Sequence, residues 1–364
     1  MAAAGPAGEA MIVFERVSIV FGGAPERALA LMERGESREA VARATAQVPG
    51  VHDCSLEVRK GEVSVLMGLS GSGKSTLLRA VNGLNPLARG RVVVRGRDGR
   101  MVDVGACDAA TLRRLRRGDV AMVFQQFGLL PWRSVVENVA LGLELAGMGR
   151  AARLAKAREV LATVNLADWA ERRVAELSGG MQQRVGLARA FATDAEILLM
   201  DEPFSALDPL IRARLQDELL ELQASMGCTI LFVSHDLEEA VKIGNTITLM
   251  EGGRIVQTGT PEEIVLRPAS PHVAAFVEAV NPLSVLRIAD VMEPANLFDD
   301  GPALPPEAPL AAALPLFAAG AGVVLVEAGA GSEAIGRITP RAVFRALAGR
   351  SGGSAGGEAP PAKG

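Results

Sequence analysis

The sequence contains no tyrosine, two tryptophans and only 4% aromatic residues in 364 positions. It has three cysteines, Cys54, Cys107 and Cys228, which are too widely spaced to form a CxxC pair or a cluster with histidine. An odd number of isolated cysteines argues against a disulfide framework and against a structural zinc site. We therefore expect a reduced chain inside the cell.

An excess of positive charge is also missing. The formal net charge is -4 and the isoelectric point is about 5.7, so no overall basic field attracts nucleic acid, and we expect no nucleic-acid partner. Arginines are clustered locally between positions 113 and 117. A solvated helix face is the simpler interpretation of this short run.

Long apolar runs are scarce. The longest, Ala311 to Val326, is interrupted by Pro315, Gly320 and Gly322, and it is shorter than a membrane-spanning helix needs to be. A helix followed by a strand explains this run better. The N-terminal residues MAAAGPAGEA lack the basic start and apolar core of a secretory signal. If the protein works at a membrane, we expect it to do so through a partner.

The most informative stretch is GLSGSGKST, from Gly68 to Thr76, which satisfies the pattern G-x-x-x-x-G-K-[ST]. It stands between a strand-like run at 62–67 and a helical run that opens at Ser75. Its glycines allow consecutive N–H groups to converge on one anion at the positive end of a helix. Lys74 can reach the β- and γ-phosphates of a nucleotide, and the Ser75 hydroxyl can ligate Mg²⁺. A chance glycine-rich turn would not be flanked by both a strand and a helix.

The rest of the chain has the periodicity of a parallel sheet wrapped in helices. Residues 11–20 alternate as a strand should, and two short helices are expected at 25–33 and 37–46. A β-rich piece at 90–104 precedes a charged helical lobe. Strands and helices then alternate at 197–200, 210–225, 229–233, 237–243 and 247–250.

Two further stretches can act on a nucleotide. The apolar strand Ile197 to Met200 ends in Asp201 and Glu202, so Asp201 can reach Mg²⁺ and Glu202 can polarise an attacking water. A capping pair at the end of a strand is the structural alternative. Ser178, at the start of LSGGMQQ, opens a helix with two glycines, which exposes a second set of amides suited to an anion.

His235 and Gln125 each follow an apolar strand. His235 would lie beside the acidic strand, where it can contact a γ-phosphate, although a lone histidine is more often structural. Gln125 can sense the metal and water, unless it is an ordinary polar loop residue. It leads into an apolar loop that contains Phe127, Leu130 and Trp132, and such a loop suggests a partner or simple packing of the lobe on the core.

The stretches GLSGSGKST, FQQFGLLP, LSGGMQQR, ILLMDEPFSALD and VSHD together resemble the ATP-binding subunit of an ABC transporter. The resemblance implies ATP and Mg²⁺ as cofactors and ATP hydrolysis as the activity. It implies catalytic roles for Glu202 as general base and for His235, Lys74 and Gln125. It implies metal contacts from Ser75, Gln125 and Asp201, and ATP contacts from Gly68, Ser70, Gly71, Ser72, Gly73, Lys74, Ser75, Thr76, Ser178, Gly179, Gly180 and Asp208.

The same resemblance implies partners. In this family two nucleotide domains close head to tail, with each ATP between one subunit's phosphate loop and the other's signature, which the resemblance places at Leu177 to Met181, so this chain needs a second copy. It also implies an integral membrane permease, an extracytoplasmic solute-binding protein that acts through the permease, and a peripheral location on the cytoplasmic face of the inner membrane.

A narrower resemblance is to importers of quaternary amines. The segment from Pro25 to Val51 resembles the insertion of that group, as do MGLSGSGKST and SALDPLIRARLQDELLELQ. The stretches FGLLPWRSVVENV and NPLSVL are closest to choline-type members, which makes choline the leading solute and glycine betaine or proline betaine the alternative. Because the chain lacks tyrosine, Phe21 is the candidate for the aromatic residue that stacks on adenine.

The expected fold class is α/β, a P-loop ABC-type ATPase core with a β-subdomain and a helical lobe at about 126–180. We expect a flexible start at 1–10, a nucleotide-binding domain at 11–280 and a flexible tail at 351–364. Residues 284–350 resemble one degenerate CBS motif. A single copy is half of the usual regulatory module, so this region is either a ligand sensor or a docking or dimer element.

Other classes of ATPase fit less well. A DNA-repair or chromosome ATPase would separate the phosphate loop from the signature by a very long coiled coil, whereas only 104 positions separate Lys74 from Ser178. A translation-associated ATPase would carry two nucleotide domains in one chain. A protein that only binds nucleotide would not need both Glu202 and His235.

Overall fold

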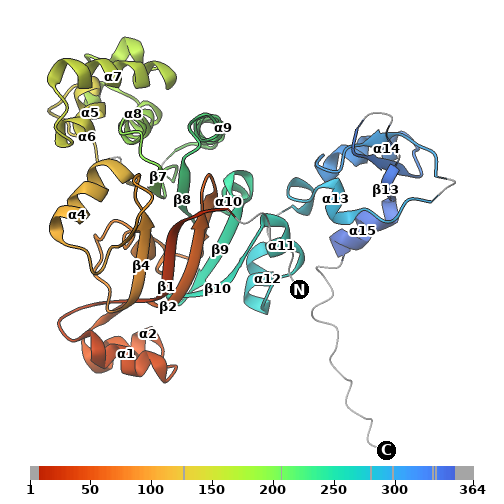
Figure 1. Ribbon diagram of the computed structural model, residues 1–364. Coiled ribbons are helices and arrows are strands. Elements are labelled where there is room, and N and C mark those ends of the chain that lie inside the picture. Colours follow the sequence, from red (N-terminus) through yellow and green to blue (C-terminus); the bar gives the residue numbers. More distant parts are fainter. Residues whose placement is uncertain are drawn as a thin grey trace, which may run out of the picture. The chain divides into compact units, whose positions relative to one another are not determined.

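The computed structural model describes residues 8–125, 128–205, 207–278, 281–296, 299–329, 332 and 334–348 (Figure 1). The chain divides into two compact units, Met1–Val256 and Gln257–Gly364. Phe127 of the apolar loop after Gln125 and Ala206 of the stretch ILLMDEPFSALD lie outside the described residues. The expected domain boundaries at 280 and 284 stay a prediction.

The first unit is built around a six-stranded sheet of order β10-β9-β3-β8-β7-β6. Strand β3 pairs in parallel with β8 and β9, and β7 pairs in parallel with β6 and β8. Every residue of β3, β7 and β8 is buried, as expected for strands with helices on both faces. The bounds are β3 Val63–Met67, β6 Val120–Val123, β7 Ile197–Asp201, β8 Thr229–Ser234, β9 Thr246–Glu251 and β10 Arg254–Gly259.

A second sheet is antiparallel and has the order β2-β1-β4-β5. Its strands are β1 Ala10–Phe21, β2 Val48–Arg59, β4 Arg89–Arg95 and β5 Met101–Asp103. The two helices expected between its first strands are confirmed as α1, Pro25–Glu33, and α2, Arg38–Thr45. The side chain of Ser37 caps α2 by accepting a hydrogen bond from Ala40 N at 3.2 Å.

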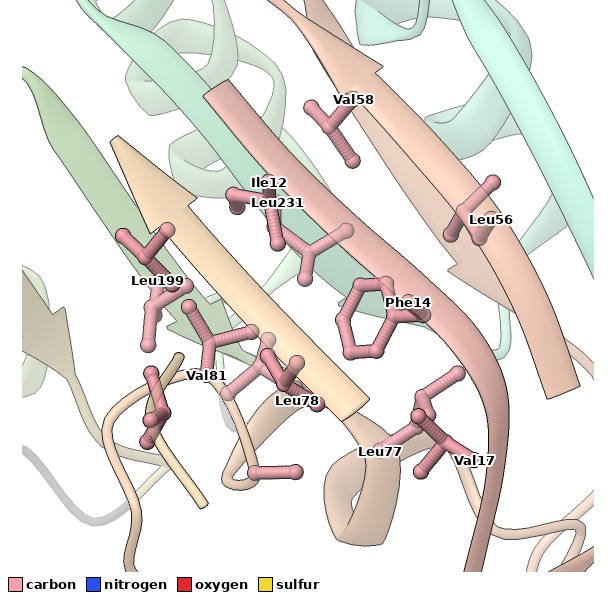
Figure 2. Packing of buried hydrophobic residues seen from close by; sticks show 14 of the residues in the cluster. Ile12, Phe14, Val17, Leu56, Val58, Leu77, Leu78, Val81, Leu199 and Leu231 are labelled. Carbon is pink, nitrogen blue, oxygen red and sulfur yellow. The ribbon is translucent and has the colours of Figure 1, made fainter. Parts of the chain in front are cut away.

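One hydrophobic core joins both sheets to helix α3, Lys74–Leu78 (Figure 2). Ile12 and Phe14 of β1 point into the same cluster as Leu77 and Leu78 of the helix. All four side chains are buried. Burial of a large apolar side chain contributes about 1.5–3 kcal/mol, so this packing fixes the helix whose first turn carries Lys74.

The helical lobe has a separate core. The lobe consists of α5 Val135–Val139, α6 Leu141–Leu145, α7 Arg150–Thr163 and α8 Gly179–Phe191, with short 3-10 turns η2 Ala167–Trp169 and η3 Val174–Glu176. The prediction of a helical region between the Gln125 loop and the acidic strand is confirmed. Before it come α4, Ala109–Arg114, and a π-helical turn η1, Leu115–Asp119, while α9 Pro209–Met226 and α10 Leu237–Ile243 flank β8 in sequence.

A buried asparagine fastens the loop that leads into the lobe. Asn138 is fully buried, and its Oδ1 accepts a hydrogen bond from Leu130 N at 2.7 Å. Its Nδ2 donates to Leu130 O at 3.1 Å and to Ser134 O at 2.9 Å. The amide therefore replaces main-chain partners that the loop lacks.

The described part of the second unit has its own core of buried apolar residues, among them Leu286, Val326 and Ile338. Its three-stranded sheet has the order β11-β12-β13. The elements are α11 Pro261–Leu266, α12 Pro271–Val277, η4 Pro282–Ser284, α13 Ile288–Val291, β11 Ala303–Leu304, η5 Leu310–Ala312, α14 Ala313–Ala318, β12 Val324–Glu327, β13 Ala334–Ile338 and α15 Pro340–Ala348. Helix α14 and strand β12 confirm the expected helix and strand within 311–326. In the described ranges no helix is both long and apolar enough to cross a membrane.

Candidate functional site

A cavity of about 400 Å³ opens beside the N-terminus of α3. It is lined by Phe21, Arg38, Val48, Pro49, Gly50, Ser70, Gly71, Gly73, Lys74, Ser75, Thr76, Gln125 and Glu202. Phe21, the phosphate loop, Gln125 and Glu202 were all expected at one site, and the fold places them around this cavity. Arg38 and the segment Val48 to Gly50 were not anticipated.

The phosphate loop needs its glycines for conformation and for space. Gly68 and Gly73 have φ values of 145° and 102°, which side chains other than hydrogen rarely tolerate. A Cβ atom at Gly68 would lie 2.1 Å from Met250 O, and one at Gly73 would lie 2.6 Å from Val51 Cγ1. The loop is therefore held against β2 and β9 in a shape that glycine alone permits.

Lys74 is 4% exposed and lies inside the loop. Its Nζ donates to Gly68 O at 2.9 Å and to Leu69 O at 3.0 Å. Burial lowers the pKa of Lys74, and the nearby carboxylates of Glu202 and Asp201 partly oppose that change. Two carbonyl oxygens thus position the ammonium group of Lys74, which can also bind an anionic ligand.

Asp201 is buried at the end of β7 and has both carboxylate oxygens engaged. Ser75 Oγ donates to Asp201 Oδ1 at 2.6 Å. Arg79 donates to Asp201 Oδ2 through Nε at 3.0 Å and Nη2 at 2.7 Å. A hydroxyl beside a carboxylate is a hard oxygen donor set that fits Mg²⁺. The contact of Arg79 with Asp201 was not predicted from the sequence, because nothing in the residues around Arg79 indicates it.

Three polar side chains meet at one oxygen. Gln125 Nε2 lies 3.4 Å from Glu202 Oε2, and His235 Nδ1 lies 3.3 Å from the same atom. These residues follow β6, β7 and β8, which are neighbours in the sheet. Glu202 has a φ of 47°, an uncommon conformation for a residue with a side chain and one often found at functional sites. The arrangement can hold a water molecule near Glu202.

A hydrogen-bonded network lies behind His235. Glu239 of α10 accepts from Gln216 Nε2 at 3.0 Å and from the Ser234 hydroxyl. Burial raises the pKa of Glu239, although these two hydrogen bonds act in the opposite direction. Arg212 Nη1 donates to Asp236 Oδ2 at 3.1 Å. The network connects α9 to the loop that carries the histidine.

The signature residues occupy another part of the first unit. Ser178 caps α8 by accepting from Met181 N at 3.4 Å, and Asp208 caps α9 by accepting from Ile211 N at 3.0 Å. A Cβ atom at Gly180 would lie 3.0 Å from Ile211 Cγ2, so the two helix starts are close. Among the described residues, those that line the 400 Å³ cavity do not include Ser178, Gly179, Gly180 or Asp208.

Phe21 lines the same cavity as Glu202. A Cβ atom at Gly50 would lie 3.1 Å from Phe21 Cε2 and 2.9 Å from Thr76 Cγ2. Glycine at position 50 therefore allows the ring, β2 and the phosphate loop to approach one another. The phenyl ring is 38% exposed, which leaves part of it available for stacking on a flat ligand.

The parallel sheet, the glycine loop at the start of α3 and the acidic end of β7 define a P-loop nucleoside triphosphatase. The sequence pattern of the family described as ABC transporter matches residues 51–205. The dimeric structure of MJ0796, a bacterial ABC transporter cassette, is similar with a TM-score of 0.57 and 29% identity, over 69% of this chain and 99% of that one.

Proteins similar over most of the chain agree with this match. The glycine betaine/proline betaine transport system ATP-binding protein ProV of Salmonella typhimurium is 46% identical over 80% of this chain and 72% of its own length. The glycine betaine transport ATP-binding protein OpuAA of Bacillus subtilis is 46% identical over 80% of this chain and 69% of its own length. The trimethylamine N-oxide transport system ATP-binding protein TmoW of Ruegeria pomeroyi is 43% identical, over 81% and 84%. The chain belongs to the ABC transporter family, as one of its ATP-binding subunits.

Proposed function

We propose that this chain is the ATP-hydrolysing subunit that energises uptake of a small methylated-nitrogen solute through a membrane permease. The observation that carries the proposal is 43–46% identity, over four fifths of the chain, to subunits named for glycine betaine, proline betaine and trimethylamine N-oxide transport. Those names favour glycine betaine as the solute over choline, which led in the sequence analysis.

The contacts in the cavity support a division of roles. Lys74 and the amides of residues 70–76 hold the β- and γ-phosphates, and Phe21 stacks on the base. Glu202 accepts a proton from the attacking water as it attacks the γ-phosphorus, while Gln125 and His235 orient that water and the carboxylate. All three side chains meet at Glu202 Oε2, which supports this assignment.

Ser75 and Asp201 fit a magnesium ion, with Gln125 nearby as a further oxygen ligand. Bound with ATP, Mg²⁺ would neutralise charge on the β- and γ-phosphates. The guanidinium of Arg79 keeps the Asp201 side chain oriented toward Ser75.

The position of the signature supports a second copy of the chain as partner. Ser178, Gly179, Gly180 and Asp208 are at two helix starts outside the cavity, where their amides can bind a phosphate held by another subunit. We propose a head-to-tail homodimer on the cytoplasmic face of the membrane, joined to a permease and, through it, to an extracytoplasmic binding protein.

We propose that residues 284–350 form a single degenerate CBS-like region, which follows a nucleotide-binding domain at 11–280 in the sequence. The segments on which that resemblance depends form α13, β12, β13 and α15 around one small core. Such a unit would regulate transport or join two copies.

The test is uptake of labelled glycine betaine, proline betaine, choline and trimethylamine N-oxide in cells with and without the gene, with Glu202→Gln as the inactive control. We expect uptake of at least one betaine to require the active gene. Absence of any gene-dependent uptake, together with failure of the chain to co-purify with a membrane permease, would overturn the proposal.

A further inference from the structure

Arg38 connects the inserted helices to the phosphate loop. It is the first residue of α2, in the segment between β1 and β2. Its Nε donates to Pro49 O at 3.1 Å, and its Nη2 donates to the same oxygen. Its Nη1 donates to Gly71 O at the tip of the phosphate loop. The guanidinium thus spans the gap between β2 and the loop at the edge of the 400 Å³ cavity.

These contacts use only some of the N–H donors of the Arg38 guanidinium group. Arginine has five N–H donors in one plane, and three are used in the bonds to Pro49 O and Gly71 O. Within the described part of the chain, the other two N–H groups have no acceptor among these contacts, so they can donate to a ligand. Arg38 is half-buried, and its two carbonyl partners hold the plane of the group in place.

The charges around the cavity leave room for an anion near Arg38. Of the described lining residues, only Arg38 and Lys74 are cationic, and only Glu202 is anionic. Burial lowers the pKa of Lys74, and the nearby carboxylate of Glu202 partly opposes that change, so the one anionic side chain of the lining acts on Lys74. No carboxylate among the described hydrogen bonds pairs with Arg38, whose partners are both neutral carbonyl groups.

The position of Arg38 indicates which part of a nucleotide it would meet. Pro49 and Val48 pair with Val20 and Phe21, and Phe21 is the candidate residue for stacking on a base. The adjacent Gly50 is packed against Thr76, whose amide follows those of Lys74 and Ser75 at the start of α3. A guanidinium held between Pro49 O and Gly71 O therefore lies between the strand that pairs with Phe21 and the phosphate loop.

We propose that Arg38 binds the nucleotide directly, with its two remaining N–H groups donating to an oxygen of the phosphate nearest the ribose. This inference rests on the proposed function, because it assumes a nucleoside triphosphate in the cavity. An arginine–phosphate contact is a charge-assisted hydrogen bond, so it adds affinity for charged nucleotides and little for an uncharged nucleoside. The inserted helices then form part of the nucleotide site.

The test is equilibrium binding of a fluorescent ATP analogue to the full chain, with ATP, ADP and adenosine as competitors. Arg38→Ala and Arg38→Gln remove the charge, and the glutamine keeps a donor for Pro49 O. Arg43→Ala, an exposed arginine on the same helix, is the matched control. We expect both Arg38 variants to bind ATP and ADP about tenfold more weakly, Arg38→Lys to be intermediate, and Arg43→Ala to match the wild type.

Two further readings separate this role from a structural one. Adenosine should bind the Arg38 variants and the wild type equally, and the ATP affinity of the variants should depend less on salt, because a screened charge contact has been lost. ATP affinity within twofold of the wild type in both variants, with or without a lower melting temperature, would overturn the proposal. Equal losses for adenosine and ATP would overturn the phosphate contact. Failure of the wild type to bind any nucleotide would overturn the proposed function and this inference together.

Discussion

Ser75 Oγ donates a 2.6 Å hydrogen bond to Asp201 Oδ1 across 126 positions of sequence. The strand that precedes Ser75, β3, is not adjacent to β7, which Asp201 ends, because β8 lies between the two. The contact forms because α3 begins above the carboxyl ends of the strands, where Asp201 ends β7. A hydroxyl and a carboxylate are therefore paired beside the phosphate loop.

This pairing predicts the effect of Asp201→Asn. The amide keeps the shape of the side chain but loses the charge that attracts Mg²⁺. We expect the Mg²⁺ concentration that gives half-maximal hydrolysis to rise by at least about tenfold, while ATP binding without metal changes little. Magnesium titrations of ATPase rate and of nucleotide binding check this, with Asp217→Asn on α9 as a surface control. An unchanged magnesium requirement would contradict the assignment.

Removal of the carboxylate at Glu202 should separate binding from hydrolysis. Glu202→Gln keeps a partner for Gln125 and His235 but cannot accept the proton of water, so hydrolysis should fall by about 10² to 10⁴. ATP binding should survive, and trapped ATP should stabilise a dimer in size-exclusion chromatography. Hydrolysis near the wild-type rate would show that another group is the base.

A large side chain introduced at Ser178 tests the role of the signature. Ser178→Arg places a large side chain at the start of α8, outside the chain's own cavity, so ATP binding should survive while turnover is lost. Ala162→Arg, an exposed position on α7 of the same lobe, should retain turnover. Turnover that persists in a preparation shown by light scattering to be monomeric would exclude the proposed homodimer mechanism.

We expect Trp132 to contact a permease, because this residue is 67% exposed on the apolar loop before α5. Leu130, by contrast, is half-buried and held by Asn138. Trp132→Ala should leave the melting temperature and basal ATPase rate unchanged while solute uptake falls. Trp169→Ala, a less exposed tryptophan of the same lobe, should leave uptake intact. If Trp132→Ala lowered the melting temperature, the basal ATPase rate and solute uptake together, this would contradict a role of Trp132 in contact with the permease.

Glu239 gives a prediction for pH. Its pKa is raised in the folded state, mainly by burial, so its contribution to stability is present below the unfolded value near 4.5 and is lost as pH rises through the folded pKa. Glu239→Gln removes the ionisable group, so the variant does not lose this stability as pH rises. We expect the melting temperature of the variant, relative to the wild type, to be higher at about pH 8 than at about pH 5, by at least about 2 °C. Exposed Glu238→Gln is the control, and a pH-independent difference would contradict the argument.

The sequence predicted the parts of the site that depend on local pattern. Gly68 to Thr76 is a continuous motif between a strand and a helix, and Asp201 follows a fully apolar strand, so both could be placed without knowledge of the fold. Periodicity also predicted α1 and α2 correctly. These segments are specified by residues close together in the chain.

Contacts that depend on strand order were beyond prediction. Arg79 meets Asp201, and Arg38 meets Gly71, because of how distant segments are arranged in space. The alternating pattern of β1 predicted a strand but not that it pairs with both β2 and β4. Long polar side chains such as arginine carry no periodic signal, so the partner of each becomes visible only when the fold is known.

Asn138 determines how the loop before α5 responds to force. Its amide group bonds both the N–H and the C=O of Leu130, so the loop cannot bend independently of the helix that carries the asparagine. Arg173 Nη1 of the same lobe also donates to Trp132 O, so a contact made at Trp132 would act on the helical lobe as well as on the loop.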